Sequence, residues 1–170
     1  ILAPCDPLEL QDSIWALIKQ SGPVYLRLGK AGEPNLTENA PEIFEFGKVR
    51  LIKGGDSDTC VIGYGPILSM AFEAAEKQEK NNGEKIAIYA CHTLKPLDNF
   101  GIKYILDSHK KIVVLEEQTS VGGLGIQIKQ IAWDHKSNCK INSMSLKDEF
   151  IHCYGTKSDL LEAHGITVNE

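Results

Sequence analysis

Apolar and polar residues follow two different periods along this chain, and the changes of period mark the elements that we expect. Runs rich in β-branched and aliphatic residues, typical of strands, occupy residues 24–28, 48–53, 59–63, 85–91, 112–115 and 140–146. Apolar residues at the spacing of an amphipathic helix follow residues 6, 66, 98, 123 and 156. Strands that alternate with helices of crossover length predict a mostly parallel sheet with helices on both faces.

The stretch KIVVLEEQTSVGGLGI, residues 111–126, reads as strand, turn and helix. Its four continuous apolar residues are typical of a strand that is covered on both faces. Glu116 and Glu117 then fall at the carboxyl end of the strand, where open α/β sheets carry ligand and partner contacts. Because neighbouring residues of a regular strand point to opposite faces, these two carboxylates cannot act together on one substrate atom. We expect a partner for a helix terminus and a surface or interface charge instead.

The beginning of the chain carries the signals of a capped helix. Asp6 is a typical N-cap, Pro7 fits the first helical position, and Glu9 completes a capping-box spacing. The residues whose spacing predicts one buried helix face are Leu10, Ile14, Leu17 and Ile18.

A long connector follows the second element. Residues 29–46 contain scattered Gly, Pro and Asn without a period, and a connector of that length is unusual inside a compact domain. We therefore place a domain boundary here. Residues 1–36 are expected to be a helix and strand remnant of one α/β domain, residues 37–46 a linker, and residues 47–170 a second domain.

Composition excludes several classes of protein. A hydrophobic content of 42% and a charged content of 24% are ordinary for a globular protein. A net charge of −5 without a Lys/Arg cluster argues against nucleic-acid binding, and no apolar run approaches the roughly 18 residues of a membrane span. Five widely spaced cysteines without a C-x-x-C pair favour a reduced, cytoplasmic setting over a disulfide framework or a zinc site. Because the chain begins ILAPCD, we expect a fragment of a longer protein.

Arg27 is the strongest single candidate for a ligand-binding residue within residues 1–36. It lies at the end of a short strand beside Gly29, where a guanidinium can hold a phosphate or a carboxylate through two parallel hydrogen bonds. From the local sequence alone, a structural ion pair or a snorkelling edge residue is the favoured interpretation.

Gly122, Gly123 and Gly125 follow a strand and open a helix, as a phosphate-cradling loop does. Their spacing departs from G-x-G-x-x-G, and no Lys-Ser/Thr pair follows, so we predict a structural turn in which the glycines serve packing. His92, at a strand end, has the residue type that titrates near neutrality. No nucleophile pattern accompanies it, and no metal-ligand spacing occurs in the chain, so we assign neither a catalytic nor a metal-binding residue.

Six motifs, taken in order, resemble the carboxy-terminal part of transketolase-like enzymes, which use thiamine diphosphate. They are APCDPLE (3–9), GPVYLRLG (22–29), FGK (46–48), VIGYG (61–65), TLKPLD (93–98) and VVLEEQTSVGGLG (113–125), with a weaker match at DEFIHCYGTKSDLLEAHGI (148–166). The resemblance implies that residues 1–36 end a pyrimidine-binding domain. It also implies that residues 47–170 form a three-layer α/β/α domain with a mostly parallel sheet of about five strands.

The same resemblance implies a function for the intact protein. The family transfers two-carbon ketol units between sugar phosphates, as a dimer with cofactor sites between subunits. Arg27 matches the arginine that contacts the sugar-phosphate substrate. The ligands of thiamine diphosphate and of its divalent metal, Mg²⁺ or Ca²⁺, would lie before Ile1, in upstream pyrophosphate- and pyrimidine-binding domains or in a separate subunit. This fragment would then be inactive alone and serve as scaffold and dimerisation domain.

Three alternatives remain open. Deoxyxylulose-phosphate synthases share these landmarks but usually carry Y-P-R-G where this chain has Leu26 before Arg27, which favours transketolase. In the beta subunits of 2-oxo acid dehydrogenases, the equivalent domain grips a partner protein. Finally, the strand-end surface with Glu117, His92 and Lys95 would suit an independent module that binds a partner or a small regulator.

Overall fold

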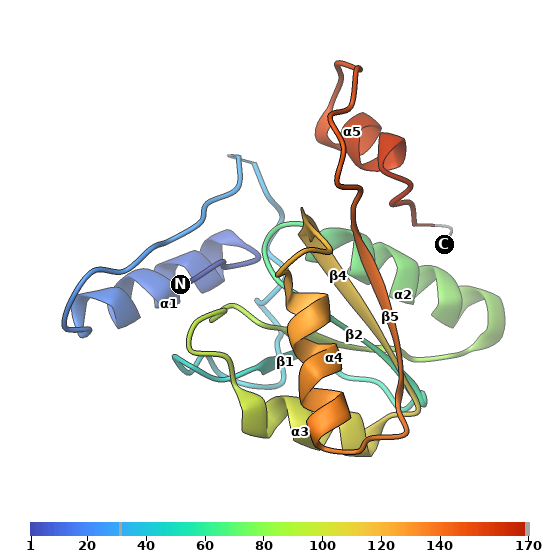
Figure 1. Cartoon of the computed structure of the whole chain (residues 1–170), viewed down its shortest axis with the longest axis horizontal. Coiled ribbons are helices and arrows are strands. Elements are labelled where there is room, and N and C mark those ends of the chain that lie inside the picture. Colours follow the sequence, from blue (N-terminus) through green and yellow to red (C-terminus); the bar gives the residue numbers. More distant parts are fainter. Residues whose placement is uncertain (31, 169–170) are drawn as a thin grey trace.

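The computed structural model describes residues 1–30 and 32–168 (Figure 1). The helices are α1 (Pro7–Ile18), α2 (Leu68–Asn82), α3 (Asn99–Ser108), α4 (Leu124–Asp134) and α5 (Lys157–Ala163). The strands are β1 (Arg50–Lys53), β2 (Thr59–Gly63), β3 (Ala87–Ala90), β4 (Lys111–Thr119) and β5 (Lys140–Leu146). In the described part of the chain, no helix combines the length and the apolar character that crossing a bilayer requires.

The five strands form one sheet in the order β1-β3-β2-β4-β5. The neighbours β3, β2, β4 and β5 are parallel, and β1 joins the edge antiparallel to β3. The predicted mostly parallel α/β sheet is therefore confirmed. It follows that β2, β3, β4 and β5 all end at the same edge of the sheet, the edge that carries ligands in folds of this class.

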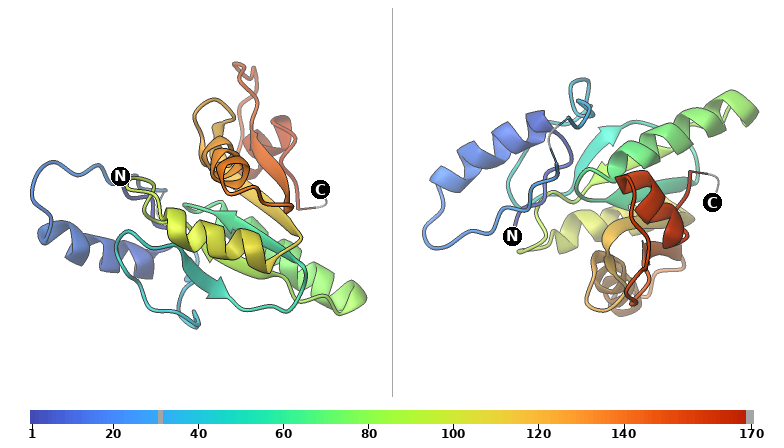
Figure 2. Two further views of the ribbon diagram at one scale, coloured as in Figure 1. Left: turned by 60° about the horizontal axis from the view of Figure 1, so that its bottom comes forward. Right: turned by 90° about the horizontal axis from the view of Figure 1, so that it is seen from above.

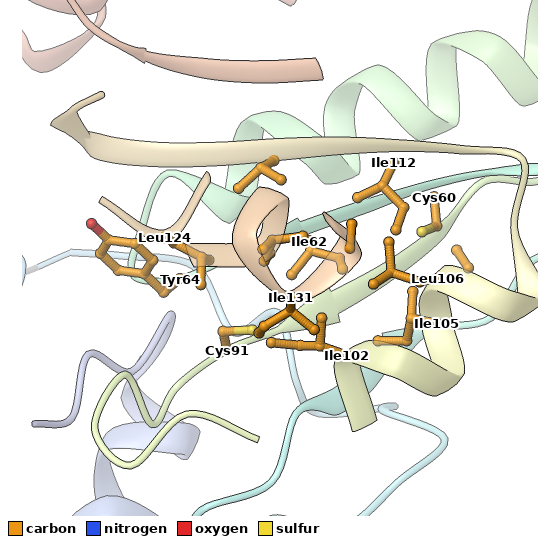
Figure 3. Packing of buried hydrophobic residues seen from close by; sticks show 14 of the residues in the cluster. Cys60, Ile62, Tyr64, Cys91, Ile102, Ile105, Leu106, Ile112, Leu124 and Ile131 are labelled. Carbon is orange, nitrogen blue, oxygen red and sulfur yellow. The ribbon is translucent and has the colours of Figure 1, made fainter. Parts of the chain in front are cut away.

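Alternate strand residues divide the core into two layers. On one face, Ile62 of β2 and Ile112 of β4 pack with apolar residues of α3 and α4, as the side chains in Figure 3 show. On the other face, Ile88 and Leu115 pack with residues of α2 and α5. The second view in Figure 2 shows the sheet between α2 and the pair α3 and α4. Each fully buried aliphatic side chain stabilises the fold by roughly 1.5–3 kcal/mol.

Residues 1–46 are here called the N-terminal arm. The first residues of this arm, from Leu2 on, are buried in the core. Leu2 is fully buried and bridges both Leu26 and Thr93. The Ala3 N–H donates to the His92 carbonyl at 2.8 Å, and the Ala3 carbonyl accepts from Gly65 at 3.1 Å. The arm is therefore fastened to the carboxyl edge of the sheet.

The strand predicted at residues 24–28 is wrong as an extended element. Only Leu26 is bridged, by hydrogen bonds that join Leu2 to Tyr25 and to Arg27. A strand needs a paired neighbour along its length, and the segment around Leu2 provides one for a single position.

The buried face predicted for α1 is also wrong. The helix has the predicted N-cap, because the Asp6 carboxylate accepts the Glu9 N–H at 2.7 Å. The Glu9 carboxylate accepts the Cys5 N–H and does not complete the predicted capping box. However, Ile14 is 44% exposed and Ile18 is 70% exposed, whereas Glu9 and Ser13 are buried. Figure 1 shows the reason: α1 leaves the sheet after its first turn, and its far end projects away from the rest of the chain.

Candidate functional site

A cleft of about 550 Å³ opens at the carboxyl edge of the sheet. The polar and glycine residues in its lining are Tyr25, Arg27, Tyr64, Lys95, Gln118, Gly122, Gly123 and Gln127. Tyr64 follows β2, Lys95 lies after β3, Gln118 lies near the end of β4, and Arg27 comes from the arm. The fold therefore brings together four of the residues singled out from the sequence: Arg27, Lys95, Gly122 and Gly123.

Arg27 is held at the rim of this cleft. Its Nη2 donates to the Glu117 backbone carbonyl at 3.2 Å and lies 3.5 Å from Glu117 Oε2. Its guanidinium carbon is 5.9 Å from the centre of the Tyr64 ring, a cation–π distance. The side chain is still 39% exposed, so it forms the structural ion pair favoured from the local sequence and remains open to a ligand.

Tyr64 contributes a neutral hydroxyl group to the lining of the cleft. Burial raises the pKa of Tyr64 to about 12, and the negative charge of Glu116 adds to the effect while Arg27 opposes it. At neutral pH the phenol therefore keeps its proton and can donate a hydrogen bond.

Glu116 serves the start of α4 rather than the cleft. Its fully buried carboxylate accepts the N–H of Leu124 at 2.6 Å and that of Gly125 at 2.9 Å. A Cβ at Gly123 would collide with this carboxylate, and Gly122 has a φ of 72° that favours glycine. The backbone amides that a phosphate-cradling loop would offer to a ligand are thus already hydrogen-bonded to the Glu116 carboxylate.

Glu117 points to the opposite face of β4 from Glu116, as the period of a strand requires. Its Oε1 lies 2.8 Å from Lys157 Nζ, at the first residue of α5, and its other oxygen faces Arg27. Glu117 therefore joins the arm, β4 and α5 through one carboxylate.

His92 lies inside the protein. Its side chain is fully buried, stacks on Phe44 with ring centres 4.2 Å apart, and has Nδ1 3.0 Å from the Thr93 hydroxyl. Burial, and then the charge of Arg50, lowers the pKa of His92 to about 3. The ring therefore lies in the interior and does not reach the strand-end surface on which His92 was considered together with Lys95 and Glu117.

Sequence reasoning missed a buried polar cluster between the arm and the sheet. Asp6 accepts hydrogen bonds from the Thr37 N–H at 2.6 Å and from its hydroxyl at 2.8 Å. Glu9 accepts the Cys5 N–H at 2.9 Å and lies 3.4 Å from Arg50 Nη1. Burial raises the pKa of Glu9, and Arg50 opposes the shift. The capping pattern predicts the local role of Asp6, but no local signal links Glu9 to Arg50.

Comparison with known proteins now places the chain. Residues 47–170 match the family described as "Transketolase, C-terminal domain". The chain belongs to this family. The resemblance drawn from the six motifs is thereby confirmed.

Relatives of this transketolase C-terminal domain chain extend over the arm as well. The 1-deoxy-D-xylulose-5-phosphate synthases of Oleidesulfovibrio alaskensis and Geobacillus thermodenitrificans are 29% and 31% identical to it over 98% of its length. A transketolase family protein of Sinorhizobium fredii is 36% identical over 74% of the chain. The chain spans only 26% of each synthase and 36% of the third relative.

Two solved structures share the fold. A split gene transketolase, solved as an inactive beta4 tetramer, superposes with a TM-score of 0.85 and 26% identity, over 99% of this chain and 54% of that one. The transketolase of Campylobacter jejuni superposes with a TM-score of 0.63 and 13% identity, over 99% of this chain and 24% of that one. At that lower identity the likeness concerns the fold alone.

The described residues do not by themselves fit a thiamine diphosphate site. Residues 1–30 and 32–168 contain no group of three or more His, Cys, Asp or Glu side chains placed to hold a metal ion. The amides of Leu124 and Gly125 at the glycine turn are already bound by Glu116. What the cleft offers a ligand is an exposed guanidinium, an ammonium group and neutral hydroxyl and amide groups.

Proposed function

We propose that this chain is the carboxy-terminal part of a thiamine diphosphate-dependent transketolase-like enzyme that transfers two-carbon ketol units between sugar phosphates. In this proposal Arg27 binds the phosphate of the substrate. The observation that supports it is the placement of Arg27, 39% exposed, in a cleft that Lys95 also lines. Two cations, one of them a planar guanidinium, suit a phosphate dianion.

The cofactor and its divalent metal, Mg²⁺ or Ca²⁺, belong in this proposal to the remainder of the enzyme. The chain contributes the substrate phosphate contact and a scaffold, and we expect no turnover from it alone. We assign residues 1–36 to the end of a pyrimidine-binding domain and residues 37–46 to the linker, in agreement with a family match that begins at residue 47.

The exposed apolar residues of the arm support association with that remainder. Trp15 is 60% exposed and Ile18 70% on α1, while Tyr25 and Leu28 in the returning segment are 63% and 59% exposed. Large exposed apolar side chains on one segment are typical of interaction sites. We propose that they contact an upstream domain or a separate subunit in a homodimeric enzyme.

A deoxyxylulose-phosphate synthase is the second candidate. It is supported by two synthases that match 98% of the chain, arm included. The structural likeness to the split gene transketolase and the presence of Leu26 before Arg27 favour the first candidate.

The test is reconstitution with the upstream part of the enzyme, thiamine diphosphate, a divalent metal and sugar phosphates. Transfer between ketose and aldose phosphates would support a transketolase. Formation of 1-deoxy-D-xylulose 5-phosphate would support the synthase, and neither product would contradict both.

In the active assembly, Arg27→Met should raise KM for phosphorylated substrates roughly 10- to 100-fold, because hydrogen bonds to charged groups contribute about 1.5–3 kcal/mol. KM for the unphosphorylated sugar should stay unchanged. Lys30→Met is the matched control, because Lys30 is an exposed cation on the same arm that does not line the cleft. An unchanged KM in Arg27→Met would contradict the phosphate role.

A further inference from the structure

We infer that Glu117 is a positioning residue for phosphate binding: it orients the Arg27 guanidinium, and Lys157 at the start of α5 holds its carboxylate in place. The inference rests on the proposed phosphate-binding role of Arg27. It adds the last helix of the chain to the site, although α5 does not line the cleft.

The contacts of Arg27 with Glu117 leave much of the guanidinium to a ligand. Both contacts, to the backbone carbonyl at 3.2 Å and to Oε2 at 3.5 Å, are made by Nη2. Neither uses Nε or Nη1, which carry the other three N–H donors of the group. Glu117 therefore fixes one edge of the guanidinium and leaves donors for a bound anion.

The Glu117 carboxylate is divided unequally between its two cations. Oε1 lies 2.8 Å from Lys157 Nζ, a short charge-assisted hydrogen bond, whereas Oε2 is 3.5 Å from Arg27, an ion-pair distance rather than a good hydrogen bond. Because Lys157 takes the stronger contact, the carboxylate orients Arg27 without neutralising it. Without Lys157, we expect the carboxylate to move fully onto Arg27 and compete with a phosphate for the same cation.

The position of Glu117 on β4 makes this division possible. Its side chain is 18% exposed, so its charge is less screened than that of a surface pair. Glu116, one residue earlier, faces α4 and is bound to the helix amides, so it does not interfere. Because Glu117 points to the face of β4 opposite that of Glu116, its carboxylate reaches both Arg27 and Lys157 of α5.

The test is a double-mutant cycle in the assembled, active enzyme. Glu117→Gln should raise KM for the phosphorylated substrate roughly 3- to 10-fold with kcat nearly unchanged, as a lost partly buried ion pair would do. The unphosphorylated substrate should show no change. Arg27→Met/Glu117→Gln should be no worse than Arg27→Met alone, because Glu117 acts through Arg27.

Lys157→Met should raise the same KM by a smaller factor, about 2- to 5-fold, and this effect should also vanish in the Arg27→Met background. Asp58→Asn is the matched control for Glu117→Gln, since it also neutralises one carboxylate of an ion pair: Asp58 lies 2.6 Å from Lys110, at the other end of β4. Urea unfolding curves would show whether any variant loses its fold. If Glu117→Gln loses its fold, Lys157→Met, a substitution of an exposed residue, still tests the inference.

The outcomes separate the two proposals. If Arg27→Met leaves KM for phosphorylated substrate unchanged, the phosphate role fails and the inference fails with it. If Arg27→Met raises KM while Glu117→Gln does not, or if the two effects multiply, Glu117 is not a positioning residue and the phosphate role stands.

Discussion

The sheet domain, residues 47–146, and the N-terminal arm use their apolar residues in opposite ways. In the sheet domain the apolar positions Ile62 and Ile112 are fully buried between strands and helices. In the arm, Ile18 is 70% exposed, whereas the charged Glu9 is fully buried against Arg50. Beyond its first residues, of which Leu2 is fully buried, the arm is thus held to the sheet by polar contacts, and large apolar side chains of α1 stay exposed. The comparison teaches that apolar periodicity identifies the apolar face of a helix, but not whether other residues of the same chain pack against that face.

The largest expected effect comes from breaking the polar attachment of the arm. Arg50→Met leaves the Glu9 carboxylate buried without its cation, and removal of one partner of a buried ion pair costs about 3–5 kcal/mol. The free energy of unfolding from urea titrations measures this loss. The double variant Glu9→Gln/Arg50→Met should recover most of it, since no uncompensated charge remains; a double variant as unstable as the single one would contradict this account.

The same substitution in the two regions should have very different effects. Ile62→Ala leaves a cavity in the sheet core and should cost about 2–5 kcal/mol of unfolding free energy. Ile18→Ala, on the exposed face of α1, should change the stability of this chain by less than about 0.5 kcal/mol. Comparable losses in the two variants would show that the arm is packed as tightly as the sheet.

A pH dependence is also expected at the contact between the two regions. The pKa of His92 is lowered from 6.5 to about 3, so the folded state binds this proton less well than the unfolded state. Its contribution to stability is complete above pH 6.5 and is lost as the pH falls toward about 3. The loss should reach about 1.4 kcal/mol for each pH unit in this window.

His92→Gln removes this titration while keeping a neutral polar side chain. The difference in unfolding free energy between the wild-type chain and this variant should therefore change steadily between pH 6.5 and pH 4. A difference that stays constant with pH would mean that the ring binds a proton as readily in the folded state as in the unfolded state.

Local signals predicted the local structure well. Asp98 accepts the Gly101 N–H at 3.0 Å as the cap of α3, and Thr156 and Asp159 form the capping box of α5. The alternation of a strand predicted that Glu116 and Glu117 face opposite sides. These features depend on residues fewer than ten positions apart, and their geometry is set by the backbone itself.

The failures share one cause. The strand at residues 24–28, the buried face of α1 and the surface position considered for His92 all depend on residues distant in the sequence. Arg50 reaches Glu9 across 41 positions, and Phe44 covers His92. No pattern in the neighbourhood of these residues carries that information.

The sequence alone determined the helices, the strands of the sheet, the fold class and the family, because backbone propensity, helix caps and apolar periods act within a few residues. Only the tertiary structure decided which strands are neighbours and that Arg27, Lys95 and the glycine turn share one cleft. It also decided that Glu117 joins Arg27 to Lys157. These placements follow from packing and charge pairing between segments up to 130 positions apart, where the free energy depends on the whole fold.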